Sequence, residues 1–310
     1  MSSTSAVHNV DQRSPLVRFT HDALPCAVEC AQRGPGQDGF VADTSSVIWA
    51  CGMLLPQHLC EHPETVRGKR CCELGAGIGL AGAVAFALGA SDVLVTDAAS
   101  AMPLLELNAQ RNAALAAAPD ATLRAQELLW GEPAQLDAAG RAGYDVLLGA
   151  DIVYHQSREE MVLLAETIAG LLAPGGVMLL AYEWREDWET TDAFHEECEA
   201  RGLVLHRSQL SDADMDDQAH QRPGPSRPPP APAYDAPASR SAVDQVLFTL
   251  WWGGAAPPAA AAAAGAPAAA GELASAPAAA TQAEELEAAP AARDAEAVAT
   301  CFTPSSCAIT

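Results

Sequence analysis

The stretch Glu73-Leu74-Gly75-Ala76-Gly77-Ile78-Gly79 decides the fold of this 310-residue chain. It follows a short apolar run, Cys71-Cys72, and leads into an Ala-rich segment, residues 80–88, that predicts a helix. The order of strand, glycine turn and helix is how an α/β fold brings backbone N–H groups up against a nucleotide-like ligand. We therefore expect an α/β domain with a ligand site at this turn.

The rest of the chain continues the alternation of strands and helices. Apolar runs predict further strands at residues 92–97, 122–128, 144–151, 177–182, 203–210 and 243–252. Helical patterns lie at residues 46–59, 102–115, 156–172 and 188–201. Repeated units of this kind indicate a mostly parallel sheet with helices on both faces.

Composition separates one folded region from polar and low-complexity segments. Residues 1–18 are polar and unpatterned, which predicts a flexible arm, and one globular domain is expected over residues 19–252, with a small hairpin or cover segment near its start. Within it, residues 211–241 are rich in Asp and Pro and predict a disordered insertion. Residues 253–310 predict a disordered tail, because they lack the large apolar side chains that offset ordering entropy.

The chain is strongly acidic, with a formal net charge of −23 and one lysine, Lys69. Phosphate contacts need clustered Lys or Arg, so the composition predicts no nucleic-acid partner. No apolar run is long enough to span a bilayer and no secretory leader is evident, so no membrane partner is expected. Nine irregularly spaced cysteines indicate reduced thiols and a cytoplasmic protein, with nuclear or organellar placement left open. The sequence predicts no oligomeric state.

The glycine turn admits two cofactors. In one register Gly77, Gly79 and Gly82 match the G-x-G-x-x-G pattern of dinucleotide sites, but the expected strand already ends at Gly75. In the other register Glu73 lies two residues before the first glycine. A carboxylate there suits a ligand that carries positive charge better than it suits a pyrophosphate. The sequence therefore favours S-adenosyl-L-methionine, with its ammonium and sulfonium groups, over NAD.

Three further residues are placed where an adenosine ligand would meet them. Asp97 ends the second strand, where an acid can accept both ribose hydroxyls of either cofactor. Trp49 precedes the first strand on an expected helix, and Trp130 follows the third strand. A flat ring at either position can pack on adenine or its neighbourhood.

The fourth strand ends in Gly149-Ala150-Asp151-Ile152-Val153-Tyr154. Catalytic groups of an open α/β sheet lie at the carboxyl ends of strands. The small Ala150 would let the backbone approach the cofactor. Asp151 would bind or orient a substrate ammonium, and Tyr154 would offer an aromatic face or a hydroxyl. Asp151 and Tyr154 are the predicted catalytic residues.

Together these motifs resemble the seven-β-strand lysine methyltransferases called methyltransferase family 16. The resemblance covers residues 19–252, and its remaining motifs are Val47-Ile48-Trp49, Leu172-Ala173-Pro174-Gly175-Gly176 and Tyr182-Glu183-Trp184-Arg185. It implies a Rossmann-like seven-stranded sheet with a reversed last strand, S-adenosyl-L-methionine as cofactor, and a protein substrate with a target lysine. Carried over by position, the implied cofactor contacts are Trp49, Gly75, Ala76, Gly77, Asp97, Trp130 and Ala150, and the residues that face the substrate are Asp151 and Tyr154.

Two segments depart from the family pattern. Asp43-Thr44-Ser45-Ser46 replaces the glycine-containing turn common before the tryptophan, and residues 211–241 form a long link between the last two strands. Both lie where substrate loops are expected, so the target protein is not predicted. Three alternatives stay open at this stage: methylation of histidine or a small molecule, an NAD-dependent oxidoreductase, and a cofactor-binding adaptor without catalysis.

The run His58-Leu59-Cys60-Glu61-His62 is a candidate metal site. On a helix its two histidines would share a face. No second pair of ligands at a recognisable zinc spacing accompanies them, so no metal is predicted.

Overall fold

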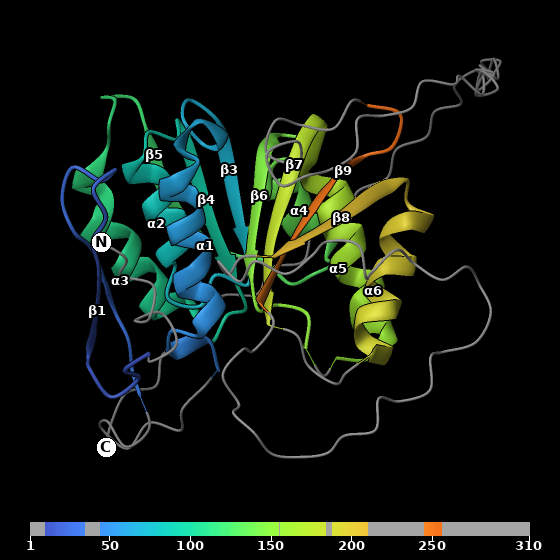
Figure 1. Cartoon of the computed structure of the whole chain (residues 1–310), viewed down its shortest axis with the longest axis horizontal. Coiled ribbons are helices and arrows are strands. Elements are labelled where there is room, and N and C mark those ends of the chain that lie inside the picture. The colour runs from blue at the N-terminus through green and yellow to red at the C-terminus, as the bar shows by residue number, and fades with distance from the viewer. Residues whose placement is uncertain (1–9, 35–43, 155, 184–187, 210–244, 256–310) are drawn as a thin grey trace, which may run out of the picture. The chain divides into compact units, whose positions relative to one another are not determined.

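A seven-stranded sheet runs through the centre of the structure, a computed structural model that describes residues 10–34, 44–154, 156–183, 188–209 and 245–255 (Figure 1). All of these residues belong to one compact unit, Met1–Ala269. The strands of the sheet are β3 (Arg70–Leu74), β4 (Asp92–Asp97), β5 (Thr122–Glu127), β6 (Tyr144–Ala150), β7 (Leu172–Glu183), β8 (Leu203–Gln209) and β9 (Gln245–Trp252). Their order is β5-β4-β3-β6-β7-β9-β8. Strands β3 to β7 are parallel, whereas β9 is antiparallel to both neighbours. The predicted α/β sheet with a reversed last strand is confirmed.

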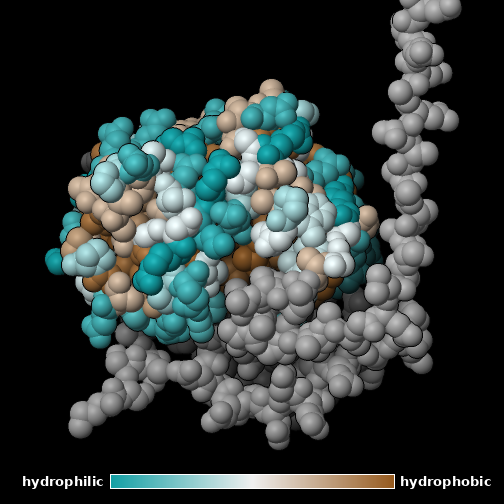
Figure 2. All heavy atoms as spheres, turned by 90° about the horizontal axis from the view of Figure 1, so that it is seen from above, coloured by the Kyte–Doolittle hydropathy of each residue, from teal (hydrophilic) through white to brown (hydrophobic). Residues whose placement is uncertain are grey.

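Helices cover both faces of the sheet, as predicted (Figure 1). On one face lie α1 (Ala50–Glu61), α2 (Leu80–Ala87) and α3 (Met102–Asn112), and on the other lie α4 (Pro133–Ala139), α5 (Arg158–Leu171) and α6 (Trp188–Ala200). Because both faces are covered, the central strands are continuously apolar. In β6, Val146 and Leu148 belong to the core under α1–α3, whereas Leu147 belongs to the core under α4–α6. Outside these cores, hydrophilic side chains cover much of the face seen in Figure 2, with apolar side chains gathered between them.

A small antiparallel hairpin, β1 (Leu16–Phe19) and β2 (Val28–Ala31), packs against α3 through side-chain amides. The Asn108 side chain accepts a hydrogen bond from the Ala31 N–H (2.7 Å) and donates one to the Ala31 carbonyl (2.9 Å). Asn112 binds both backbone groups of Glu29 in the same way (3.3 and 2.9 Å). Strand β1 begins at Leu16, within the segment that the sequence analysis assigns to the arm.

The structure differs from the sequence prediction at several element boundaries and contains one helix that was not predicted. The helix predicted at residues 46–59 begins only at Ala50, after a short 3-10 turn at Thr44–Ser46. The strand predicted at residues 177–182 begins at Leu172, because α5 runs directly into β7 and the glycine-rich segment becomes an irregularity in its pairing with β6. Helix α4 is missing from the prediction. It is short, and Pro133 occupies its first position.

Several predicted segments lie outside the described residues: the insertion at 211–241, most of the tail at 253–310, and residues 1–9 of the arm. Among the helices of the described ranges, none combines the length and the apolar character needed to cross a bilayer.

Candidate functional site

A cavity of about 880 Å³ lies at the carboxyl ends of β3, β4, β5 and β6. Parallel strands bring these ends to one edge of the sheet, so residues far apart in the sequence meet there. The nine residues that the sequence predicts for the site all line this cavity: Trp49, Gly75, Ala76, Gly77, Asp97, Trp130, Ala150, Asp151 and Tyr154.

The glycine turn between β3 and α2 owes its shape to residues with positive φ. Gly75, Gly77 and Gly79 have φ of 56°, 55° and 77°, values that only glycine adopts readily. A Cβ at Gly75 would lie 2.7 Å from the Ile152 side chain, and one at Gly79 would lie 2.7 Å from the Leu105 side chain. Close packing therefore excludes side chains at these positions and leaves the backbone of the turn at the cavity.

Glu73, the acid before the turn, is buried. Its carboxylate accepts a hydrogen bond of 2.7 Å from the N–H of Gly82 in the first turn of α2. Burial raises the pKa of Glu73 to about 8; the Gly82 N–H opposes this shift, and the charge of Asp97 adds to it. The side chain also lines the cavity. Glu73 thus holds the start of α2, a role that the sequence does not predict, and presents a mostly protonated carboxyl group to the site at neutral pH.

Asp97 is fixed to the glycine turn. Its Oδ2 accepts a hydrogen bond from the Gly77 N–H and its Oδ1 accepts one from the Ala98 N–H, both at 2.7 Å. The carboxylate therefore lies at the end of β4 and beside the turn, which is the position from which an acid can reach ribose hydroxyls.

The two tryptophans reach the cavity from different elements. Trp49 is the residue before α1 rather than part of the helix; its side chain is exposed, and its Nε1 donates to the Thr44 carbonyl (2.8 Å). Trp130 is partly buried against the core under α4–α6. Its ring lies 3.8 Å from the position that a Cβ of Gly75 would occupy, so the ring borders the glycine turn.

Asp151 has a left-handed backbone, with φ of 58°, and is buried. Its N–H donates to the Ala181 carbonyl on β7 (2.9 Å), and its Oδ1 accepts a hydrogen bond from the Glu183 N–H (3.3 Å). A non-glycine residue in this region costs about 1–3 kcal/mol, and such strain concentrates at functional sites. Tyr154 is partly buried near the end of the same loop, and its N–H donates to the Gln156 side chain.

The rim of the cavity carries exposed apolar residues, and the sequence prediction missed two of them, Leu129 and Leu163. Among the described residues five large apolar side chains are exposed, and three of them line this cavity: Trp49 (42%), Leu129 (47%) and Leu163 (38%). In the sequence, Leu129 belongs to an apolar run that resembles a strand end and Leu163 to an amphipathic helix. Neither pattern distinguishes an exposed leucine from a core one.

The residues that line the cavity include five acids, Glu73, Asp97, Glu132, Asp151 and Glu160, and no Lys, Arg or His. Glu132 and Glu160 lie on the rim, three residues from Leu129 and Leu163 respectively, and both are exposed. A cleft lined by one sign of charge concentrates ligands of the opposite sign. The electrostatics therefore favour a cationic ligand, a cationic substrate, or both.

Comparisons with known proteins point to one family. The sequence profile described as lysine methyltransferase matches residues 37–199. Protein N-lysine methyltransferase METTL21A of Danio rerio is 35% identical over 168 residues, which cover 54% of this chain and 73% of that protein. METTL21A of Mus musculus is 33% identical over 145 residues, which cover 47% of this chain and 63% of that protein. A solved TehB-like SAM-dependent methyltransferase of Corynebacterium glutamicum shows 15% identity and a TM-score of 0.41, with 64% of this chain and 87% of that chain covered.

The strand order, the reversed β9 and the glycine turn after β3 define an S-adenosyl-L-methionine-dependent class I methyltransferase. The profile match spans more than half of the chain. This chain belongs to the lysine methyltransferase family. Family membership decides between the two cofactors that the glycine turn alone leaves open, and it excludes the NAD-dependent oxidoreductase.

Proposed function

We propose that this enzyme transfers a methyl group from S-adenosyl-L-methionine to the side-chain amine of a lysine in a protein substrate. The observation that carries the proposal is that the residues lining the cavity include five acids and no Lys, Arg or His. A lysine side chain reaches the site as an ammonium ion, which such a lining attracts. The relatives named above are protein N-lysine methyltransferases, which supports the same substrate class.

The described residues fit the cofactor. A volume of about 880 Å³ lies within the range of about 300–1,000 Å³ typical of small-molecule sites. The glycine turn leaves its backbone accessible, and Asp97 is fixed where it can accept hydroxyl protons. We therefore assign the cofactor contacts to Trp49, Gly75, Ala76, Gly77, Asp97, Trp130 and Ala150. When bound, S-adenosyl-L-methionine supplies a methyl group on a positively charged sulfonium.

Asp151 and Tyr154 prepare the amine in this proposal. A lysine amine has a free pKa of about 10.4 and must lose a proton before it can attack. A neighbouring cation favours that loss, and solvent can accept the proton, so no strong protein base is required. Asp151 accepts a hydrogen bond from the amine and fixes its direction, while Tyr154 offers its ring or hydroxyl. The hydrogen bonds of Asp151 to β7 keep it in place, and alignment is the main contribution of the protein.

The substitution Asp151→Asn tests this role with little risk to the fold, because asparagine also tolerates a left-handed backbone. Lysate proteins would be incubated with methyl-labelled cofactor, and the labelled residue identified by mass spectrometry. We expect label on lysine, a loss of at least ~100-fold in the Asn variant, and unchanged binding of S-adenosylhomocysteine. Asp120→Asn, at an exposed position outside the cavity, is the matched control. Full activity of Asp151→Asn would refute the assigned role of Asp151. Label on histidine or on a small molecule would show that lysine is not the target.

We further propose that the rim selects lysines flanked by apolar and basic residues. Glu132 donates its N–H to the Leu129 carbonyl (3.1 Å), so the two side chains extend from one turn. Gly131 holds that turn on α5: its N–H donates to the Thr167 hydroxyl (2.8 Å), and the Leu163 side chain packs where its Cβ would be. The turn after β5 therefore presents Leu129 and Glu132, and α5 presents Leu163 and Glu160, on one fixed surface. This surface is complementary to a peptide with apolar and positively charged side chains.

The double substitution Glu132→Lys with Glu160→Gln tests the rim without removing the N-terminal cap of α5. The Glu160 carboxylate completes a capping box with Ser157, and glutamine preserves that arrangement. Methylated lysines mapped from a lysate should show basic and apolar neighbours with the natural enzyme and lose the basic preference with the variant. Glu106→Lys, exposed on α3, serves as the control. An unchanged neighbour preference in the double variant would exclude the rim as the selecting surface.

A further inference from the structure

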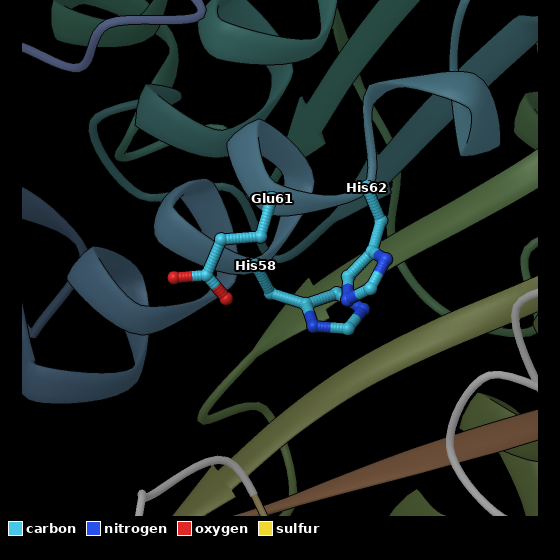
Figure 3. A group of neighbouring side chains, drawn as sticks. All are labelled: His58, Glu61 and His62. Carbon is cyan, nitrogen blue, oxygen red and sulfur yellow. The ribbon is translucent and has the colours of Figure 1, made fainter.

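A cluster of metal-ligating side chains lies at the C-terminal end of α1, separate from the residues that line the cavity. His58 and His62 are one helical turn apart, and their rings lie side by side with centroids 4.7 Å apart (Figure 3). Glu61 extends from the same turn. One potential ligand atom from each of the three side chains lies within 4.8 Å of the other two.

The His58 side chain is placed so that it can bind a metal. His58 is partly buried, and its ring lies against the ring of His62. Within the described part of the chain, no hydrogen bond uses either of its ring nitrogens, so a lone pair is available.

Acidic groups complete the surroundings of the pair. The Glu61 Oε1 accepts a hydrogen bond from the Gln57 side chain (2.7 Å), which orients the carboxylate and leaves its second oxygen available. A Glu64 oxygen lies 3.7 Å from the His62 Nδ1. A carboxylate beside one nitrogen of a ligating histidine is the usual outer partner that orients the ring and raises its basicity. Nε2 of His62 would then be the ligating atom.

We propose that His58, Glu61 and His62 form a binding site for a divalent transition-metal ion such as Zn²⁺ or Ni²⁺. Imidazole nitrogens favour these ions, whereas Mg²⁺ and Ca²⁺ favour sites built from oxygen atoms alone. Water would occupy the remaining coordination positions, because three protein ligands leave an open site. In the sequence, no second histidine or cysteine pair at a zinc spacing accompanies His58 and His62, which argues against a metal site. The structure instead brings the Glu61 carboxylate close to the two histidines as a third ligand.

The position of the cluster separates it from the methyl-transfer chemistry. Helix α1 has 12 residues, and it begins next to Trp49 at the cavity. At 1.5 Å per residue the helix is about 18 Å long, so a metal at its far end does not contact the cofactor site. Metal binding would instead stabilise the C-terminal end of α1, a helix whose other end forms part of the cavity wall. The expected effect is thus on the thermal stability of the protein rather than on the transfer step.

Isothermal titration of the full chain, freed of metal with EDTA and kept under a non-thiol reductant, tests the site with ZnCl₂ and NiCl₂ as probes. We expect one site per chain, a rise in Tm with metal, and a dissociation constant at least ~10-fold weaker for His58→Gln with His62→Gln. His21→Gln, a histidine on another element, should leave binding unchanged. With Co²⁺ as probe, the visible absorption of the bound ion should appear in the natural protein and disappear in the double variant.

Equal metal affinity in the natural protein and the double His variant would overturn the site, and so would the absence of binding to the natural protein. Glu61→Gln separates a two-ligand from a three-ligand site. Weaker binding supports the carboxylate as a ligand, whereas unchanged binding contradicts its assignment. Circular dichroism of each variant shows whether α1 and the fold persist.

Discussion

Replacing Glu73 with glutamine should change how the stability of the enzyme depends on pH. The buried carboxyl group has its pKa raised from 4.5 to about 8 by burial, with Asp97 as a further cause. Between these values the folded protein keeps the proton that the unfolded chain has lost. Each rise of one pH unit in this window therefore favours the unfolded chain by about 1.4 kcal/mol. From pH 5.5 to 7.5, the natural protein should lose roughly 2.5 kcal/mol relative to Glu73→Gln, because glutamine cannot ionise and the folded carboxyl group begins to ionise near the upper end of this window.

Urea denaturation at pH 5.5, 6.5 and 7.5 measures this difference. The Gln side-chain oxygen can still accept the hydrogen bond from the Gly82 N–H, so the start of α2 should persist. Comparing the two proteins at each pH cancels other titrations, including that of His58, whose pKa of about 4 makes stability rise with pH up to its ordinary value near 6.5. Parallel stability curves for the two proteins would refute the assignment of a protonated Glu73. Titration with S-adenosyl-L-methionine adds a second measurement: binding of a cation beside Glu73 should release a proton only from the natural protein.

Two further substitutions test how the glycine turn is held. Gly79→Ala should destabilise the protein by about 1–3 kcal/mol, because its φ is positive and the new Cβ would lie 2.7 Å from Leu105. Gly175→Ala is the control, because Gly175 also has a positive φ but a Cβ there would meet open space, so this variant measures the backbone cost alone. Equal losses of stability for the two variants in urea denaturation would contradict a steric cost at Gly79. Asn108→Ala should cost about 2–4 kcal/mol and weaken S-adenosylhomocysteine binding in calorimetry, because the side chain bonds to the carbonyls of Ala31 and Ile78, both at 2.9 Å. A loss under ~0.5 kcal/mol at Asn108 would show that the amide contributes little.

Local patterns in the sequence predict the positions of the glycine turn, Asp97 and Asp151, because each directly follows or ends a recognisable apolar strand. Family resemblance adds the reversed last strand, which no local pattern indicates. The partner of Glu73 escapes prediction because it depends on how α2 packs against β3. The exposure of Leu129 escapes it as well, since an apolar residue at a strand end has the same pattern whether or not another element covers it. The roles of the nine site residues and the domain boundaries stay predictions.

The reversed strand β9 has a consequence for the order in which the sheet assembles. β8 leaves the ribosome before β9, yet among the described strands its one partner in the sheet is β9. Until β9 arrives, β7 has an unpaired edge, which is the kind of surface that recruits other chains. The parallel strands and their helices can fold first, and closure of the sheet then waits for β9, which 35 residues (210–244) separate from β8. Each doubling of the length of this link raises the free energy of closing it by only about 0.6 kcal/mol, so a longer link changes the stability of the folded enzyme little. It instead lengthens the time during which the nascent chain exposes the edge of β7 and can aggregate.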